Sequence, residues 1–123
     1  MQRLILAAAL GLASGSALAF DIACDRPEYL QLKTADKAEL QQEFCRTTRA
    51  HLLNIDLHRE TQSTISKLRS IGADTSKQTA QAEQDLTAAL SCSKAAAEYA
   101  GALERRFKSK PPAVKVCTSP GGI

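Results

Sequence analysis

Two long stretches of the chain contain almost no residue that would break a helix, and one short segment separates them. Residues 36–70 contain no Gly or Pro, and residues 75–108 contain a single Gly. The segment between them offers Gly72 for a helix C-terminus and Asp74 or Thr75 to cap the helix that follows. Two long helices joined by so short a turn must pack antiparallel, because only then do both apolar faces leave water. The sequence therefore predicts an all-α protein whose main body is an antiparallel helical hairpin.

Each predicted helix has one apolar face. On the first helix, which Asp36 or Thr34 can cap with Glu39 at capping-box spacing, the apolar positions are Leu40, Phe44, Leu52, Ile55, Ile65 and Leu68. On the second, apolar or small residues alternate in steps of four and three, as in a coiled-coil seam: Ala82, Leu86, Ala89, Ser93, Ala96, Ala100, Leu103 and Phe107. Gly101 interrupts this helix, and indicates either fraying near its end or a close backbone contact.

Shorter elements flank the hairpin. Residues 25–33 predict a short N-terminal helix, with Pro27 in its first turn where a missing N–H costs nothing. After the second long helix, Pro111 and Pro112 prevent further helix, and Val114 and Val116 alternate with polar residues. We expect an extended C-terminal strap that runs back along the second helix, followed by a flexible tail at 118–123.

The N-terminus has the pattern of a secretory signal peptide. Residues 1–19 carry one cation at Arg3, an apolar run over 4–12 and a terminal Ala-Leu-Ala. The run is shorter than the roughly 20 residues that cross a bilayer, and no second apolar stretch follows, so we expect no membrane span. These features predict cleavage before Phe20, a single helical domain over 20–117, and a periplasmic or secreted location.

All four cysteines lie beyond the predicted leader, which predicts two disulfides that staple a small helical core. The zinc-binding spacing C-x-x-C is absent from the sequence. In a straight hairpin, Cys45 faces the level of residue 99, about 10 Å along the axis from Cys92. That mismatch disfavours Cys45–Cys92. Cys24 and Cys45 are symmetric about the expected turn at residues 34–35, and an extended tail can reach back from residue 108 to Cys92, so we expect Cys24–Cys45 and Cys92–Cys117.

One segment of the first long helix has the composition of a functional site. HLLNIDLHRE contains His51, Asp56, His58 and Glu60. His51 and His58 are seven residues apart, too far to share one ion unaided, and are expected to be partly buried or surface residues; a metal site or pH switch is the alternative. The carboxylates of Asp56 and Glu60 lie at i and i+4, which fits a solvated face better than general acid–base work.

Basic residues surround the predicted end of the second helix: Arg105, Arg106, Lys108, Lys110 and Lys115. Cations there complement the helix dipole, and the alternative is a patch that binds an anionic surface. Without Arg3, fifteen Lys and Arg face thirteen Asp and Glu, a net charge of +2. So small a charge predicts neither nucleic acid nor a membrane as the main partner.

These features together predict a small exported protein that acts by binding another protein. The sequence shows no nucleophile elbow, no glycine-rich phosphate loop and no cofactor motif, so we expect neither catalysis nor a cofactor. The protein partner is not identified, and a homodimer in which two hairpins form a four-helix bundle is one form of such binding. The alternatives are a metal- or pH-responsive small-ligand-binding protein that uses His51, Asp56 and His58, and a binder of an anionic surface.

Overall fold

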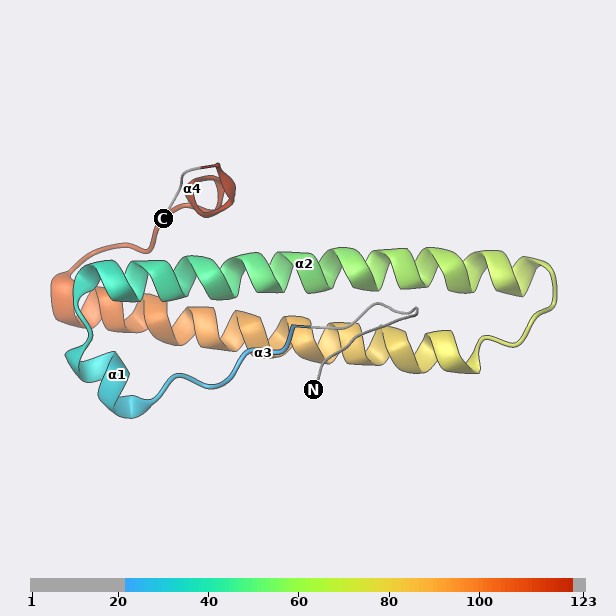
Figure 1. Ribbon diagram of the computed structural model, residues 1–123, viewed down its shortest axis with the longest axis horizontal. Coiled ribbons are helices and arrows are strands. Elements are labelled where there is room, and N and C mark those ends of the chain that lie inside the picture. Colours follow the sequence, from blue (N-terminus) through green and yellow to red (C-terminus); the bar gives the residue numbers. More distant parts are fainter. Residues whose placement is uncertain (1–21, 121–123) are drawn as a thin grey trace, which may run out of the picture.

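A computed structural model describes residues 22–120 and has a helical hairpin as its body (Figure 1). The predicted leader at 1–19 and residues 121–123 of the predicted tail lie outside the described residues. In chain order the helices are α1 (Tyr29–Thr34), α2 (Lys37–Ser70), α3 (Ser76–Phe107) and α4 (Val114–Thr118). The all-α hairpin is confirmed, and residues 22–120 contain no strand. No helix within this range is long and apolar enough to cross a bilayer.

Local chemistry sets the ends of the long helices. Asp36 caps α2, its carboxylate accepting the Glu39 N–H at 2.8 Å, as the capping box predicts. Gly72, with φ +75°, donates to Arg69 O in the turn. Asp74 then accepts from the backbone and hydroxyl of Ser76, and these hydrogen bonds lower the pKa of Asp74. The α3 helix ends earlier than Pro111 requires, because Lys108 takes a left-handed conformation with φ 53°.

The packing of α3 corrects the predicted seam. Every second position of the predicted seam is buried, as expected: Ala82, Ala89, Ala96 and Leu103. The intervening positions are shifted by one residue: Asp85, Cys92 and Tyr99 are buried, whereas Leu86 and Ser93 are exposed. The apolar pattern missed this because the true seam contains an acid, a disulfide and a phenol. On α2 two of the six predicted positions, Leu40 and Ile65, are buried, and the other four, Phe44, Leu52, Ile55 and Leu68, are half-buried.

The disulfides join Cys24 to Cys92 and Cys45 to Cys117, so the sequential pairing is wrong. The prediction assumed that each short arm folds onto the long helix next to it in sequence. Instead α1 packs on α3, which carries the preceding segment over α3 to Cys92. The C-terminal segment in turn crosses to α2 (Figure 1). Its six residues, 108–113, can span roughly 20 Å, more than the 8–10 Å between packed helices.

The C-terminal strap also differs from its prediction. Residues 108–113 are not helical, but the chain then forms one turn of helix, α4, instead of continuing as an extended strand. Arg49 fixes this turn on α2 by donating from Nη1 to Cys117 O at 3.0 Å. Val114 and Val116 remain exposed, so they do not cover the alanine face of α3.

Candidate functional site

The two histidines of the first long helix lie against the second. His51 Nδ1 is 2.8 Å from Ala89 O, and His58 Nδ1 is 3.0 Å from Ala82 O. The histidines are seven residues apart on α2 and the alanines seven apart on α3, so one antiparallel packing unit occurs twice. Both side chains are half-buried, in agreement with the expected role as polar residues of the hairpin.

These contacts fix one tautomer of each imidazole. A carbonyl oxygen only accepts, so Nδ1 must carry the proton, and a neutral ring then leaves its Nε2 unprotonated. We expect the nitrogen spectrum of ¹⁵N-histidine-labelled protein to show Nδ1–H for His51 and His58 at a pH where they are neutral. Free imidazoles favour Nε2–H, so an Nε2–H pattern for either ring would contradict this arrangement.

The other residues of this segment form no shared site with the histidines. Asp56 is exposed and pairs with Arg59 at 3.6 Å, and Glu60 is exposed as well. Among the described residues, no three His, Cys, Asp or Glu side chains are grouped so that they could hold a metal ion. In this segment Asp56 and Glu60 therefore face solvent, whereas His51 and His58 pack against α3.

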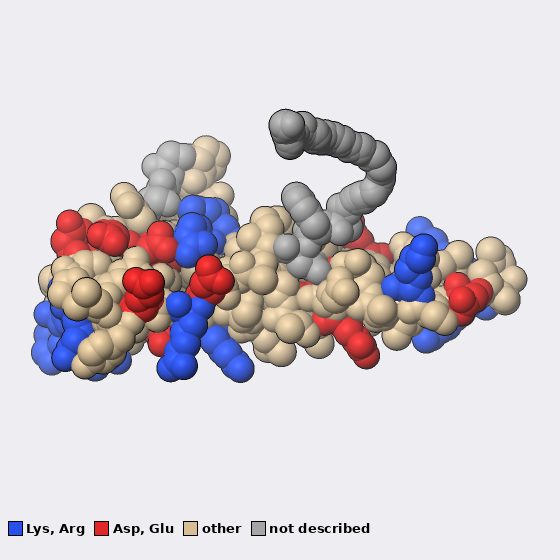
Figure 2. All heavy atoms as spheres, turned by 60° about the horizontal axis from the view of Figure 1, so that its bottom comes forward, with Lys and Arg blue, Asp and Glu red and all other residues tan. Residues whose placement is uncertain are grey.

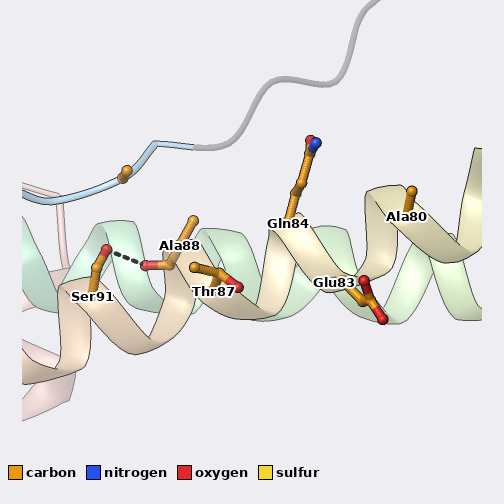
Figure 3. Close-up of a pocket in the computed structure, with 7 residues that line it drawn as sticks. Ala80, Glu83, Gln84, Thr87, Ala88 and Ser91 are labelled. Carbon is orange, nitrogen blue, oxygen red and sulfur yellow. Dashed lines mark hydrogen bonds between the residues drawn. The ribbon is translucent and has the colours of Figure 1, made fainter.

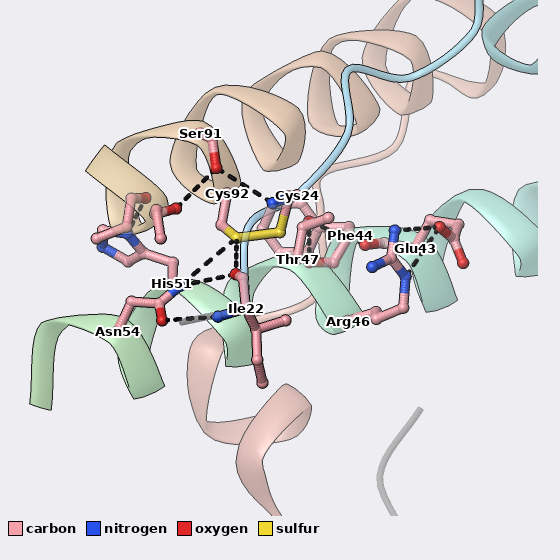
Figure 4. Close-up of a disulfide and its surroundings, with 12 residues drawn as sticks. Ile22, Cys24, Glu43, Phe44, Arg46, Thr47, His51, Asn54, Ser91 and Cys92 are labelled. Carbon is pink, nitrogen blue, oxygen red and sulfur yellow. Dashed lines mark hydrogen bonds and ion pairs between the residues drawn. A yellow bond between two sulfur atoms is a disulfide. The ribbon is translucent and has the colours of Figure 1, made fainter. Parts of the chain in front are cut away.

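Residues 22–28, which precede α1, form an N-terminal arm, and Asn54 links this arm to the core beside the Cys24–Cys92 disulfide (Figure 4). Its side chain is fully buried, donates from Nδ2 to Ile22 O at 2.8 Å, and accepts the Ile22 N–H at 3.2 Å. Two residues further along the arm, the Cys24 N–H donates to Ser91 Oγ at 3.1 Å. Ile22 O also lies 3.2 Å from Cys92 Sγ, a contact without a hydrogen bond because a disulfide sulfur has no proton. The side chains of Asn54 and Ser91 thus satisfy three backbone groups of the arm: the N–H and C=O of Ile22 and the N–H of Cys24.

Tyr99 joins three helices near the other end of the hairpin. Its hydroxyl lies 3.2 Å from Gln31 Oε1 of α1 and 3.5 Å from Glu43 Oε1 of α2. Burial raises the pKa of Tyr99, and the charge of Glu43 raises it further. Arg46 donates to the same Glu43 oxygen at 2.7 Å, which raises the pKa of Arg46. This network holds α1 in place and contains no nucleophile paired with a base.

A hollow of about 540 Å³ lies along α3, where small and polar side chains line it (Figure 3). The lining residues are Ala23, Ala80, Glu83, Gln84, Thr87, Ala88 and Ser91. Glu83 is the only ionisable group among them. The Ser91 hydroxyl donates to Ala88 O at 2.8 Å and accepts from the arm, so it has no base to activate it. The lining therefore offers no catalytic arrangement.

The predicted basic cluster is divided by the fold. Lys115 lies on α4, on the opposite side of the hairpin from α1 (Figure 1). Arg105 and Arg106 face α1 instead and line a hollow of about 470 Å³. We call it the cationic hollow, and its residues are Tyr29, Leu32, Lys33, Arg105 and Arg106. Figure 2 shows basic side chains gathered at this end of the molecule.

We call four aliphatic residues the leucine strip: the half-buried Leu52 and Ile55 of α2 and the exposed Leu86 and Leu90 of α3. Leu52 is one heptad after Cys45, so it lies on the edge of α2 that carries the disulfide to α4. Leu86 and Leu90 lie on the edge of α3 away from Ser91 and the N-terminal arm, and are 42% and 53% exposed. The face of the hairpin that carries α4 is therefore apolar next to α4.

Comparison of the chain with protein-family models, curated proteins and solved structures finds no match. The site can therefore be interpreted only from its own residues. Sequence reasoning located Arg105 and Arg106 but missed Tyr29 and Lys33, because their contribution depends on α1 docking against α3. Leu86 was expected inside the hairpin, and its exposure follows from the shifted seam.

Proposed function

We propose that this is a small exported, non-catalytic protein that acts by a protein–protein contact through the leucine strip. The observation that supports the proposal is the exposure of Leu86 and Leu90, one turn apart on a helix whose other face is packed. Isolated exposed leucines are common on protein surfaces, whereas a contiguous apolar strip is typical of an interaction site. Two intramolecular disulfides are compatible with export.

The partner that we propose for the strip is a second copy of this chain. Leu52 and Leu90 lie at one level of the antiparallel hairpin and Ile55 and Leu86 at the next, so the strip spans both helices. A two-fold axis through it would place two such faces together as a four-helix bundle. The formal charge of the whole chain is only +3, so two copies repel each other weakly.

The test combines export and self-association in one preparation. The full chain is expressed with its leader and recovered from the periplasm or medium. We expect its mass, measured by mass spectrometry, to be that of a chain whose first residue is Phe20. Sedimentation equilibrium of this product is expected to show a monomer–dimer equilibrium. Leu86→Gln with Leu90→Gln should weaken dimerisation about tenfold per leucine, because each change removes apolar burial from the interface.

The control is Leu53→Gln, a leucine of α2 that is 44% exposed and does not belong to the strip. It should leave the equilibrium unchanged. A wild-type protein that stays monomeric at the highest measurable concentration would refute self-association, and an equal effect of Leu53→Gln would refute the strip as its surface.

A further inference from the structure

The lining of the cationic hollow contains three cationic side chains and no acidic one. Lys33 on α1 faces Arg105 and Arg106 in the last turn of α3, and no acidic residue lines the hollow. Three ion pairs occur among the described residues, Arg26–Glu98, Arg46–Glu43 and Arg59–Asp56, and none involves these cations. Complementing the dipole of α3 explains Arg105 and Arg106. Lys33 lies in the last turn of α1, so the C-terminal cations of two helices meet in the same hollow.

Arg106 is held by a hydrogen bond, and the other two cations of the hollow lie against a ring or a glycine. Arg106 donates from Nη1 to Leu32 O at 3.1 Å, and its guanidinium lies 4.7 Å from the centre of the Phe107 ring. Arg105 Nη1 lies 2.9 Å from the point that a Cβ at Gly101 would occupy, so the glycine leaves room for this guanidinium against α3. The ammonium of Lys33 lies 4.9 Å from the centre of the Tyr29 ring. For Arg106, part of the entropic cost of ordering the side chain around a ligand is thus already met in the free protein.

A second charged hollow shows what is particular to this one. It is lined by Arg26, Lys94 and Glu98, among other residues, and has a volume of about 540 Å³. There Glu98 lies 3.6 Å from Arg26 and neutralises part of the charge. The cationic hollow lacks such a carboxylate, and instead has the exposed ring of Tyr29 at its rim.

We propose that the cationic hollow binds a phosphate monoester whose organic group lies against Tyr29. Such a group carries about −1.5 to −2 charges at neutral pH and has three acceptor oxygens. Arginine presents a planar pair of donors that matches phosphate geometry, and Lys33 adds a point charge. A volume of about 470 Å³ is within the range of small-ligand sites. The inference is independent of the proposed self-association, because the leucine strip contains none of these residues.

The binding test uses the exported, oxidised product at low salt, with phenyl phosphate as the probe and benzenesulfonate as its matched control. The sulfonate keeps the ring and three oxygens but carries a single charge. Phenyl phosphate is expected to shift the NMR signals of Tyr29, α1 and the end of α3, and to bind at least fivefold more tightly than the sulfonate. Vesicles of phosphatidylcholine with phosphatidic acid distinguish a lipid source of the phosphate from a soluble one. Binding to neither phosphate source, or equal binding of the sulfonate, overturns the proposal.

Variants that each remove one positive charge distinguish a specific phosphate site from general attraction of the phosphate to the net charge of the protein. Lys33→Gln and Arg105→Gln should each weaken phenyl phosphate binding about fivefold, and Arg105→Lys should weaken it because the planar fork is lost. Arg106 is left intact because it also holds α1. The control removes the same charge at the far end of the hairpin, with Lys67→Gln and Lys77→Gln. Equal weakening by the control pair would show attraction to net charge alone and overturn the site.

Gly101→Ala provides a variant in which stability and binding change in opposite directions. Alanine favours a helix interior over glycine, so the melting temperature should rise. The new Cβ displaces the end of Arg105, so binding should weaken about two- to threefold. Unchanged binding would contradict the assigned position of Arg105.

Discussion

Replacing the Cys24–Cys92 disulfide by two alanines is expected to lower the melting temperature by roughly 20 °C. The cross-link joins residues 68 positions apart, and the chain-entropy relation gives about 4 kcal/mol for a loop of this size. For a domain of about 100 residues, 1 kcal/mol corresponds to roughly 4–8 °C. Cys92 is fully buried and packs with Ala50 and Ala95, so the truncation also leaves space in the core. The measurement is thermal unfolding followed by circular dichroism.

The matched comparison is Cys45→Ala with Cys117→Ala, which opens a loop of nearly equal size, 72 residues. Its entropic loss is also about 4 kcal/mol, but the bond secures the one-turn helix α4 and not the centre of the hairpin. We expect a smaller total effect and a loss of hydrogen-exchange protection confined to the C-terminal segment. A shift below about 5 °C for the Cys24–Cys92 variant would contradict its central role. A Cys24–Cys45 peptide in non-reducing digests would contradict the pairing itself.

The contrast between the hairpin and its arms shows what sequence patterns determine. The hairpin could be predicted because its signals are local: a glycine in the turn, an aspartate cap at Asp36, and an apolar period along α2. The level of Cys45 opposite residue 99 also agrees with the structure, in which Glu43 and Tyr99 are in contact. The arms could not be placed in the same way, because their docking depends on single long-range contacts such as Asn54 with Ile22 and Arg106 with Leu32.

The same distinction applies to the surfaces proposed to bind ligands. Arg105 and Arg106 stand out in the sequence, but α1 supplies the other half of the cationic hollow, and no local pattern indicates that α1 packs on α3. The sequence predicts Leu86 in the core because it continues the series of apolar or small residues spaced alternately four and three apart. Its neighbour Asp85 is buried instead, since Thr61 and Gln81 each donate a hydrogen bond of 2.9 Å to its carboxylate. A buried acid with specific partners therefore reversed the expected orientation of this part of α3.

Asn54→Asp is expected to destabilise the protein by about 3 kcal/mol at pH 7, with a penalty that depends on pH. The change preserves shape but removes the donor that Ile22 O accepts, and it buries a carboxylate against that oxygen. Burial without a cation raises the pKa of an aspartate above its unfolded value of about 3.9. The protonated acid can still donate to Ile22 O. The penalty should therefore be small below about pH 4 and should grow as the pH rises through the folded-state pKa.

Urea unfolding of the variant and the wild type from pH 3 to 8 measures this penalty as a difference, so the titration of other carboxylates cancels. The control is Gln62→Glu, the same change from amide to acid at an exposed position of α2, which should stay within about 0.5 kcal/mol of the wild type. A penalty for Asn54→Asp that does not vary with pH would show that residue 54 reaches water. In that case the arm would depend on the Cys24–Cys92 bond and on the hydrogen bond from Cys24 N to Ser91 Oγ, whereas the predicted pH dependence would establish Asn54 as a further anchor.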